Sequence, residues 1–269
     1  MFILGAGKVG TAFARALRAD GAAVTLRAAR KGLPRAVIDA DLLVLAVRDG
    51  MLVEVVAELA ARRGVSSRTV VVHNAGALGP ASLAPLRGIA RGVAQMHPMI
   101  SFASTTYTPT LTRGQVNVDG DPAAVALAER IARRLGMSPR RMPDVDKVAY
   151  HAAGGFVANG AAALAAAGTR LLSNAGVEPK IAVQMLGPLL RSVADNVERL
   201  GLPGALTGPV RRGDRHGVAK HLEVIAAKAP ELTSLYRALV AAQVPLARQI
   251  GDADSSVFDD IERLVAPDA

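Results

Sequence analysis

The fold is decided by the first ten residues, MFILGAGKVG. Residues 2–4 are apolar and strand-like, and Gly5, Gly7 and Gly10 follow with the spacing G-x-G-x-x-G. From Val9 onward, apolar residues recur at helical spacing until Gly21. A glycine turn that joins a strand to an amphipathic helix is the setting of the dinucleotide-binding fingerprint. We therefore expect the pyrophosphate of a nucleotide to bind at this turn.

Each glycine of the turn has its own expected role. Gly5 permits the tight turn, Gly7 lets the backbone approach the pyrophosphate, and Gly10 lets the helix pack closely on the strand. The N-terminus of the helix then faces the phosphate charge. The residues expected to contact the cofactor here are those of the whole turn: Gly5, Ala6, Gly7, Lys8, Val9 and Gly10.

The end of the second predicted strand, residues 23–26, carries cations. Sites for NAD place an acidic residue there to hold the ribose 2′-hydroxyl. This chain instead continues Arg27-Ala28-Ala29-Arg30-Lys31, with no acid. Guanidinium groups bind phosphate through paired hydrogen bonds. We therefore expect Arg27 and Arg30 to hold a 2′-phosphate, which favours NADP over NAD as the cofactor.

Three further strand ends contribute candidate residues. The unbroken apolar run 42–47 predicts a central parallel strand, and its last residues, Ala46 and Val47, are small enough to lie beside a cofactor. The strand predicted at 69–72 is followed by Asn74, whose amide is suited to hold a ribose or substrate hydroxyl. The strand at 93–96 leads into a loop in which His97 and Ser101 are candidate substrate contacts. In an open α/β sheet, such residues meet at the carboxyl edge.

The chain changes character after Ser138-Pro139. Six strand candidates with helical crossovers precede this point and predict an α/β fold with a doubly wound parallel Rossmann sheet. Residues 144–269 carry almost no strand signal and predict an all-α C-terminal domain. We expect an NADP-binding domain at 1–140 and a helical substrate and dimerisation domain at 141–269.

Composition excludes several classes of protein. The 269 residues are 51% hydrophobic, which indicates a folded globular chain, and none is a cysteine, which excludes disulfides and thiolate metal sites. The net charge is +9 but only 3% of residues are aromatic, so we expect a small anionic substrate and not a nucleic acid. The Ala-rich run 152–168 predicts a buried helix, not a membrane span. A strand-like start without a charged leader favours a cytoplasmic protein, and no metal is expected.

The chemistry is expected near the start of the second domain. Lys147 and His151 are four residues apart and share one helical face, and Asn159 lies two turns further along. Reduction of a carbonyl group by a nicotinamide needs a positive donor near the developing alkoxide and a proton. Lys147 and His151 are therefore candidate catalytic residues, and Asn159 would orient the substrate. Arg212 is a candidate for binding a substrate carboxylate.

A family resemblance rests on several of these stretches. They are GAGKVG, His97-Pro98 with Ser101-Phe102, Tyr150-His151 with Asn159, and LTGP (206–209) followed by Arg212-Gly213-Asp214. The chain resembles the 6-phosphogluconate dehydrogenase-like superfamily, which includes ketopantoate reductases and pyrroline-5-carboxylate reductases. Within it, the chain is similar to a family that joins a Rossmann-like domain to a helical domain of unknown function. Its members are provisionally described as NADP oxidoreductases.

The resemblance leaves three readings of the function open. In ketopantoate reductases a catalytic lysine is followed four residues later by asparagine; Lys147 matches the lysine, and His151 stands in the asparagine position. This implies an NADP-dependent oxidoreductase that reduces a small anionic 2-oxo acid. The small residues after His151 also resemble pyrroline-5-carboxylate reductases, which implies an imine reductase. The third reading is an NADP-binding sensor or scaffold without turnover. The superfamily also implies a homodimer.

Overall fold

The computed structural model describes residues 1–267, which form two compact units. The first unit is Met1–Ala158 and the second begins at Asn159, so the division falls inside the long helix α4 (Lys147–Asn174). The sequence analysis placed a domain boundary at 140/141, before this helix. Each unit is described by itself below.

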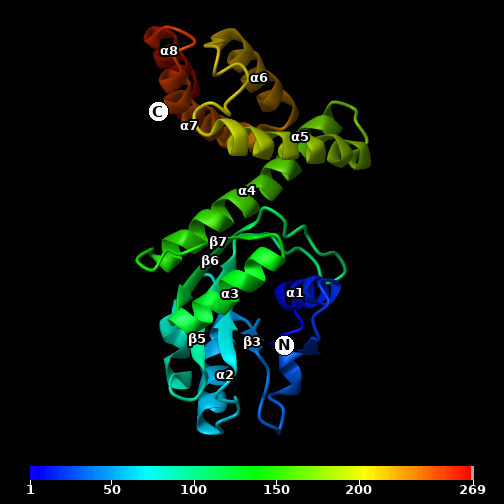
Figure 1. The fold of residues 1–269 in the computed structure, drawn as a ribbon. Coiled ribbons are helices and arrows are strands. Elements are labelled where there is room, and N and C mark those ends of the chain that lie inside the picture. Colours follow the sequence, from blue (N-terminus) through cyan, green and yellow to red (C-terminus); the bar gives the residue numbers. More distant parts are fainter. Residues whose placement is uncertain (268–269) are drawn as a thin grey trace. The chain divides into compact units, whose positions relative to one another are not determined.

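The first unit is built on one mostly parallel sheet (Figure 1). In residues 1–267 the sheet has seven strands in the order β2-β1-β3-β4-β5-β6-β7. The predicted α/β class and the Rossmann sheet are confirmed. The strands are β1 (Phe2–Leu4), β2 (Thr25–Arg27), β3 (Leu42–Leu45), β4 (Val70–His73), β5 (Gly92–Pro98), β6 (Gln115–Gly120) and β7 (Ser138–Arg140).

Helical segments cover both faces of this sheet. Helices α1 (Lys8–Ala19) and α3 (Pro122–Arg134) pack on one face around Phe13, Val44 and Ile131. Helix α2 (Asp49–Ala61) and the 3₁₀ helix η2 (Pro80–Leu86) pack on the other. Strands β3 and β4 are buried along their full lengths, as their unbroken apolar runs predict.

The sheet departs from the expected pattern at three places. Strand β6 runs antiparallel to β5, because the connection 99–114 contains Pro109 and Gly114 and no helical crossover. Strand β7 was not expected, because Pro139 lies inside it; Pro is tolerated at a sheet edge. Between β2 and β3, the described chain forms only the short 3₁₀ helix η1 (Ala29–Lys31).

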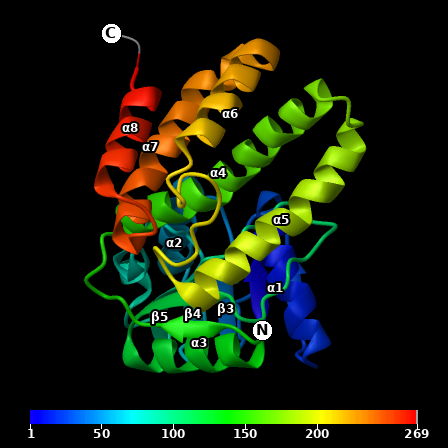
Figure 2. The same cartoon turned by 90° about the horizontal axis from the view of Figure 1, so that it is seen from above.

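The second unit is helical, as predicted. It contains the later part of α4, then α5 (Pro179–Leu200), α6 (Arg215–Lys228), η3 (Pro230–Leu232), α7 (Thr233–Ile250) and α8 (Ser255–Val265). Helices α6, α7 and α8 pack together around Val218, Val244 and Phe258, and Figure 2 shows them side by side. Among the helices of residues 1–267, none combines the length and the apolar character of a membrane span.

Candidate functional site

The glycine turn has the geometry that its sequence predicts. Gly5 has a φ of +115°, and a Cβ there would run into the carbonyl oxygen of Ala46. A Cβ on Gly10 would collide with the carbonyl oxygen of Gly5. By contrast, no heavy atom of the described chain, apart from its immediate neighbours, lies within 4 Å of the position a Gly7 Cβ would take. Gly5 and Gly10 therefore serve packing, whereas Gly7 leaves space in front of the turn.

The start of α1 presents backbone N–H groups to this space. Gly7 is the N-cap residue, and no side chain of the described residues accepts a hydrogen bond from the first turn. The N–H groups at a helix N-terminus have no partner within the helix and attract anions. An uncapped turn beside an open glycine fits a pyrophosphate. Lys8 is exposed at the same place, and Val9 is half-buried beneath it.

A pocket of about 340 Å³ lies next to the turn and carries the predicted cations. Ala6 lines it together with Arg27, Ala28, Arg30 and Lys31. The arginines are not equivalent. Arg27 donates from Nε to the carbonyl oxygen of Gly32 at 2.7 Å and from Nη2 to that of Lys31 at 2.7 Å. Arg27 therefore holds its own loop in shape, while Arg30 and Lys31 are exposed at the pocket.

The carboxyl ends of β1 and β3 lie beside the glycine turn. The chain order of the sheet reverses between these strands, and this is where open α/β sheets bind their ligands. Ala46 follows β3 directly, and its N–H donates to the carbonyl oxygen of Leu4 at 2.8 Å. Ala46 and Val47 are half-buried at this edge, next to the glycine turn. The structure thus brings together the cofactor residues predicted from β1, β2 and β3.

A second group of polar side chains lies at the ends of β4, β5 and β6. Gln95 is fully buried; its amide donates to the carbonyl oxygens of Ala75 (2.8 Å) and Leu78 (2.6 Å), and its oxygen accepts from Asn117 at 3.1 Å. Asn74, predicted to contact the cofactor, donates to the carbonyl oxygen of Met96 at 2.5 Å. Asn74 Oδ1 is buried without a hydrogen-bond partner among residues 1–267. This network fixes the loop after β4.

His73 is part of the same network. Its Nδ1 accepts from the N–H of Ala75 at 3.2 Å, and its Nε2 lies 3.1 Å from the carbonyl oxygen of Gly79. Nε2 therefore carries the proton of a neutral imidazole. Burial lowers the pKa of His73 to about 4. His73 therefore shapes the loop, a role that the sequence analysis did not predict.

The first turns of α4 pack against this loop. His97 on β5 makes edge-to-face contacts with the rings of Tyr150 (centroids 5.5 Å apart) and His151 (5.8 Å). His151 remains exposed, whereas Tyr150 is half-buried and burial raises its pKa. Gly76 lies beneath both imidazoles. The structure therefore brings the predicted substrate residue His97 and the predicted catalytic residue His151 together.

Lys147, the other predicted catalytic residue, is held by an ion pair. Its Nζ lies 3.1 Å from Asp119 Oδ2 on β6 and donates to the carbonyl oxygen of Met142 at 3.0 Å. The Lys147 and Asp119 side chains are only 12% and 16% exposed. Asp119 was missed in the sequence analysis, because nothing in its local pattern links it to a residue 28 positions later. The ion pair fastens the start of α4 to the sheet.

Three predicted site residues make none of the contacts described above, and two of them, Asn159 and Arg212, belong to the second unit. Ser101 is exposed in the segment after β5, and Asn159 is exposed on α4 at the start of the second unit. Arg212 is exposed in the loop before α6. Its neighbour Arg211 forms the fixed ion pair of that loop, with Asp252 at 2.7 Å, while Asp214 caps α6 by accepting from the N–H of Gly217.

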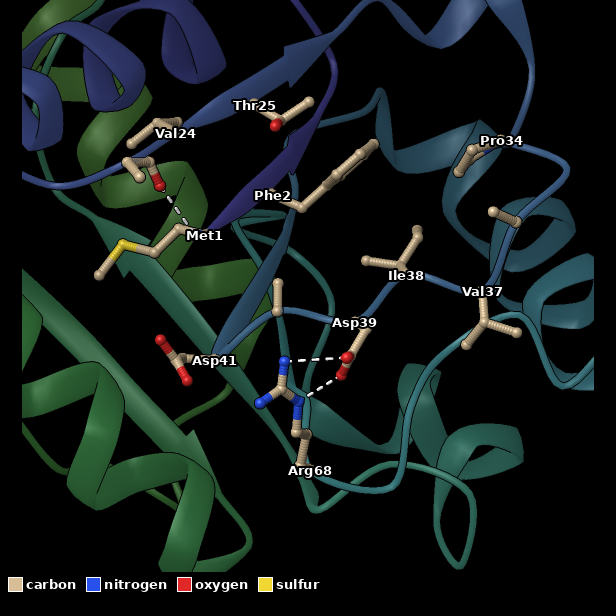
Figure 3. Close-up of a pocket in the computed structure, with 13 residues that line it drawn as sticks. Met1, Phe2, Val24, Thr25, Pro34, Val37, Ile38, Asp39, Asp41 and Arg68 are labelled. Atoms are coloured by element: carbon tan, nitrogen blue, oxygen red, sulfur yellow. Dashed lines mark hydrogen bonds and ion pairs between the residues drawn. The ribbon is translucent and has the colours of Figure 1, made fainter.

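A further hollow of about 680 Å³ lies at the amino edge of the sheet. It is lined by the first residues of β1 and β2 and by the segments that precede β3 and β4. Figure 3 shows Phe2, Ile38 and Pro34 around it, with Arg68 paired to Asp39 at its rim. It exists because no helix of the described chain covers this face between β2 and β3. None of the predicted site residues lines it, and it lies at the opposite edge from the glycine turn.

Two family models match this chain. One describes a Rossmann-like domain and matches residues 1–98; the other describes a domain of unknown function, DUF2520, and matches residues 115–243. These matches agree with the predicted resemblance to a family that joins a Rossmann-like domain to a helical domain of unknown function. A search of curated proteins found no match.

Several solved structures share the fold of this chain. A Bacteroides fragilis protein provisionally named an NADP oxidoreductase is 22% identical, with a TM-score of 0.69 over 91% of this chain and 97% of that one. A Thermotoga maritima protein, TM1727, is also 22% identical, with a TM-score of 0.66 over 93% and 98%. An imine reductase from Streptomyces aurantiacus is 15% identical, with a TM-score of 0.61 over 99% of each chain. At these identities the likeness establishes the fold alone.

Proposed function

We propose that this protein is an NADP-dependent oxidoreductase that reduces a small anionic 2-oxo acid by hydride transfer. The observation that carries the proposal is the pocket where the open glycine turn meets two exposed cations. Ala6 of the turn, Arg30 and Lys31 all line it, and no acidic residue does. A site of this composition fits a phosphorylated ribose better than a free 2′-hydroxyl.

The residues present fit the cofactor on three counts. Gly7 leaves space for close approach, the first turn of α1 presents uncapped N–H groups, and the pocket beside them is cationic. Bound there, reduced NADP would supply a hydride. Arg30 and Lys31 would bind the 2′-phosphate, and Arg27 would keep their loop in the conformation that presents them.

The chain would supply the proton from the first turns of α4. His151 is exposed, lies beside the strand ends of β4 and β5, and is of the residue type that most often acts as a general acid. Lys147 would act through its charge, from a position fixed by Asp119 and Met142. The net charge of +9 supports an anionic substrate.

Reduction of an imine is the second candidate function. The ion pair with Asp119 leaves Lys147 less suited to act as an electrophile, and a protonated imine needs no such lysine. The Streptomyces aurantiacus protein that shares the fold is named an imine reductase. An NADP-binding sensor without turnover is the third candidate.

Turnover and binding assays separate these candidates. The purified protein would be titrated with NADPH and NADH, and NADPH oxidation would be followed with ketopantoate as the 2-oxo acid and 1-pyrroline-5-carboxylate as the imine. Oxidation with ketopantoate supports the first candidate, and oxidation with the imine alone supports the second. Tight NADPH binding without turnover supports a sensor, and failure to bind either nucleotide refutes the proposal.

We also propose that the protein is a homodimer whose interface includes α5. In residues 1–267 this helix buries one side chain, Ala182, and exposes several large apolar ones. A soluble monomer rarely exposes a contiguous apolar surface of this kind. Its exposed large apolar residues are Ile181, Val183, Met185, Leu189, Leu190, Val193, Val197 and Leu200.

A further inference from the structure

The imidazole of His97 lies at the carboxyl end of β5, the edge of the sheet at which open α/β folds bind their ligands. The rings of Tyr150 and His151 contact it nearly at right angles, with interplanar angles of 77° and 75°. Gly76 lies on another side: a Cβ added there would come within 2.7 Å of His97 Nε2, closer than a carbon atom can approach. The position of the His97 ring is therefore well defined.

The two ring nitrogens of His97 have different surroundings. Among the described residues, neither nitrogen has a hydrogen-bond partner, and only Nδ1 is fully buried. Nε2 therefore keeps contact with solvent and is the nitrogen that a ligand can reach.

The surroundings also keep His97 uncharged. Burial, and then the neighbouring rings of His151 and His73, lower the pKa of His97 to about 4. At neutral pH the ring therefore carries a single proton, on one of its two nitrogens. Which nitrogen holds this proton decides whether His97 offers a ligand a hydrogen-bond donor or an acceptor.

A proton on Nδ1 of His97 would have no acceptor. Asn117 is opposite His97 in the β5–β6 ladder, so both side chains lie on the same face of the sheet. The amide nitrogen of Asn117 donates to Gln95 Oε1, and the Gln95 amide donates to the carbonyl oxygens of Ala75 and Leu78. Asn117 Oδ1 is itself unpaired, so it accepts no hydrogen bond from His97. Because buried N–H groups without an acceptor are rarer than unpaired buried acceptors, the proton is expected on Nε2.

We propose that His97 is a catalytic residue in its neutral Nε2–H form: Nε2–H donates a hydrogen bond to the carbonyl oxygen of the 2-oxo acid and stabilises the negative charge that develops on this oxygen. This inference rests on the proposed function and deepens it, because it names the residue that binds the reacting oxygen. Gly76 permits this role, since a larger residue would displace Nε2.

A neutral imidazole can bind this oxygen without giving up its proton. When the carbonyl carbon gains the hydride that reduced NADP supplies, the electron pair of the C=O π bond moves to the oxygen, and the hydrogen bond from Nε2–H becomes stronger. Loss of the proton from neutral His97 would leave an imidazolate anion, so His97 keeps it. The proton that completes the hydroxyl group comes from the acid form of His151: its N–H bond breaks as the O–H bond forms. His97 thus stabilises charge, and His151 transfers the proton.

The same donor distinguishes the two candidate substrates. A carbonyl oxygen accepts a hydrogen bond from Nε2–H. The nitrogen of a protonated imine carries a hydrogen of its own and has no lone pair with which to accept one, so two donors would face each other and both would lose their partners. The inference therefore predicts a carbonyl substrate and not an imine.

Ring nitrogen spectra of the full-length protein test the position of the proton without any substrate. The chain has five histidines, and the signals of His97 are those that disappear in the variant His97→Gln. At neutral pH we expect long-range ¹H–¹⁵N spectra to show His97 with its proton on Nε2 and a lone pair on Nδ1. A proton on Nδ1 would overturn the proposal.

Three substitutions of His97 test its role in turnover with NADPH and ketopantoate. Gln places an amide N–H near the position of Nε2, Asn places one near Nδ1, and Leu places none. Because one donor to a developing oxyanion is worth about a hundredfold in rate, we expect His97→Leu and His97→Asn to lower kcat by about this factor and His97→Gln by less than about tenfold. KM should change less than about threefold, because the hydrogen bond strengthens only as charge develops. Wild-type kcat in all three variants would mean that His97 does not bind the reacting oxygen, while the proposed reduction would stand.

Two glycine substitutions in the loop after β4 provide a matched pair. Gly76→Ala is expected to displace His97 Nε2 and to lower kcat as His97→Leu does. A Cβ on Gly79 would meet Lys147 Cε at 3.9 Å, an ordinary contact, so Gly79→Ala is expected to keep the kcat of the wild type. Equal kcat values for the two variants would contradict the role of Gly76. Circular dichroism would confirm that both variants are folded.

Two further outcomes separate failure of this inference from failure of the proposed function. Oxidation of NADPH with 1-pyrroline-5-carboxylate alone would overturn the assignment of His97 to a carbonyl oxygen and leave the oxidoreductase standing. NADPH binding without oxidation by either substrate would overturn the proposed function, and with it the catalytic role of His97, even if the spectra show the proton on Nε2.

Discussion

Lys147 Nζ lies 3.1 Å from Asp119 Oδ2, and this ion pair joins the first turn of α4 to strand β6. Both side chains are largely shielded from water. The pair sets where His151, one helical turn later, lies over the loop after β4. Lys147, which the sequence predicts to be catalytic, therefore also holds the start of α4 against the sheet.

The energetic weight of this pair can be measured. Asp119→Asn keeps the shape of the side chain but leaves a partly buried ammonium without its counter-charge, so we expect the free energy of unfolding to fall by about 1–3 kcal/mol. The double variant Asp119→Asn/Lys147→Met should recover most of this loss. Urea unfolding followed by circular dichroism provides the measurement. Strictly additive losses would mean that the two side chains do not stabilise each other.

We expect the preference for NADPH over NADH to depend on Arg30 and Lys31. Changing both to Ala should weaken NADPH binding by about 2 kcal/mol, roughly thirtyfold, and leave NADH binding nearly unchanged. Arg27→Ala should weaken both nucleotides, because Arg27 binds the carbonyl oxygens of its own loop. Arg35→Ala, an exposed arginine a few residues further along, is the control. Calorimetric titration measures all of these, and equal losses of NADPH and NADH in the Arg30/Lys31 variant would refute the 2′-phosphate assignment.

Two glycines of the turn should affect different properties: Gly7 the binding of NADPH, and Gly10 the stability of the fold. Gly7→Ala adds a methyl group in open space, so stability should match the wild type while NADPH binding falls at least tenfold, or about 1.4 kcal/mol. Gly10→Ala would force its methyl group into the carbonyl oxygen of Gly5 and should destabilise the domain severely. Thermal unfolding and nucleotide titration of the two variants provide the comparison. Unimpaired NADPH binding by Gly7→Ala would place the nucleotide elsewhere.

Stability should fall with pH in a window set by His73. Its folded pKa of about 4 lies below the ordinary value of 6.5, so between these values the unfolded chain binds a proton that the native protein excludes. Native stability is therefore complete above about pH 6.5 and falls by up to about 3 kcal/mol as the pH drops to 4. His97, lowered for a similar reason, adds to the effect.

The variant His73→Gln isolates this contribution. Glutamine offers a donor and an acceptor but does not titrate, so the variant should be less stable at pH 7 and lose less stability between pH 6.5 and 4. Denaturant midpoints at several pH values measure both quantities. An unchanged pH dependence would show that His73 binds its proton equally well in the native and unfolded states.

The proposed dimer depends on apolar side chains of α5. Leu189 and Val193 are one helical turn apart and exposed. Changing both to Asp should convert the dimer to a monomer, because two charges cannot be buried unpaired in an apolar interface. Val224→Asp on α6, also at an exposed apolar position, is the control. Light scattering after size-exclusion chromatography reports the mass; a wild-type monomer would refute the proposal.

Hydrophobic periodicity and glycine spacing predicted those helices and strands that short stretches of sequence determine. The strand before Gly5, the helix after Gly7 and the buried runs of β3 and β4 follow from periodicity and glycine spacing. The antiparallel β6 and the edge strand β7 depend instead on how distant segments pair, which periodicity does not encode.

Some features of the candidate site were likewise predicted from the sequence, and others are seen only in the structure. The tight turn at Gly5 and the close packing at Gly10 are as predicted from the sequence, while the predicted contact of Gly7 with a pyrophosphate stays a prediction. For Arg27, the sequence indicated a cation at a strand end but not that its guanidinium binds its own loop. The support of His151 by Gly76, and of Lys147 by Asp119, joins residues far apart in the chain. Contacts of this kind cannot be predicted from local sequence patterns and are visible only in the structure.

The crossover from β2 to β3 lacks a helix in the described chain, so the cations beside the glycine turn belong to a short surface loop and not to the packed interior. Most substitutions in residues 28–37 would therefore leave the sheet and its two covered faces intact. We therefore expect that exchanging this loop changes the preference between phosphorylated and unphosphorylated nucleotides and leaves the ends of β4 and β5 as they are. Grafting that one loop between family members should transfer the preference.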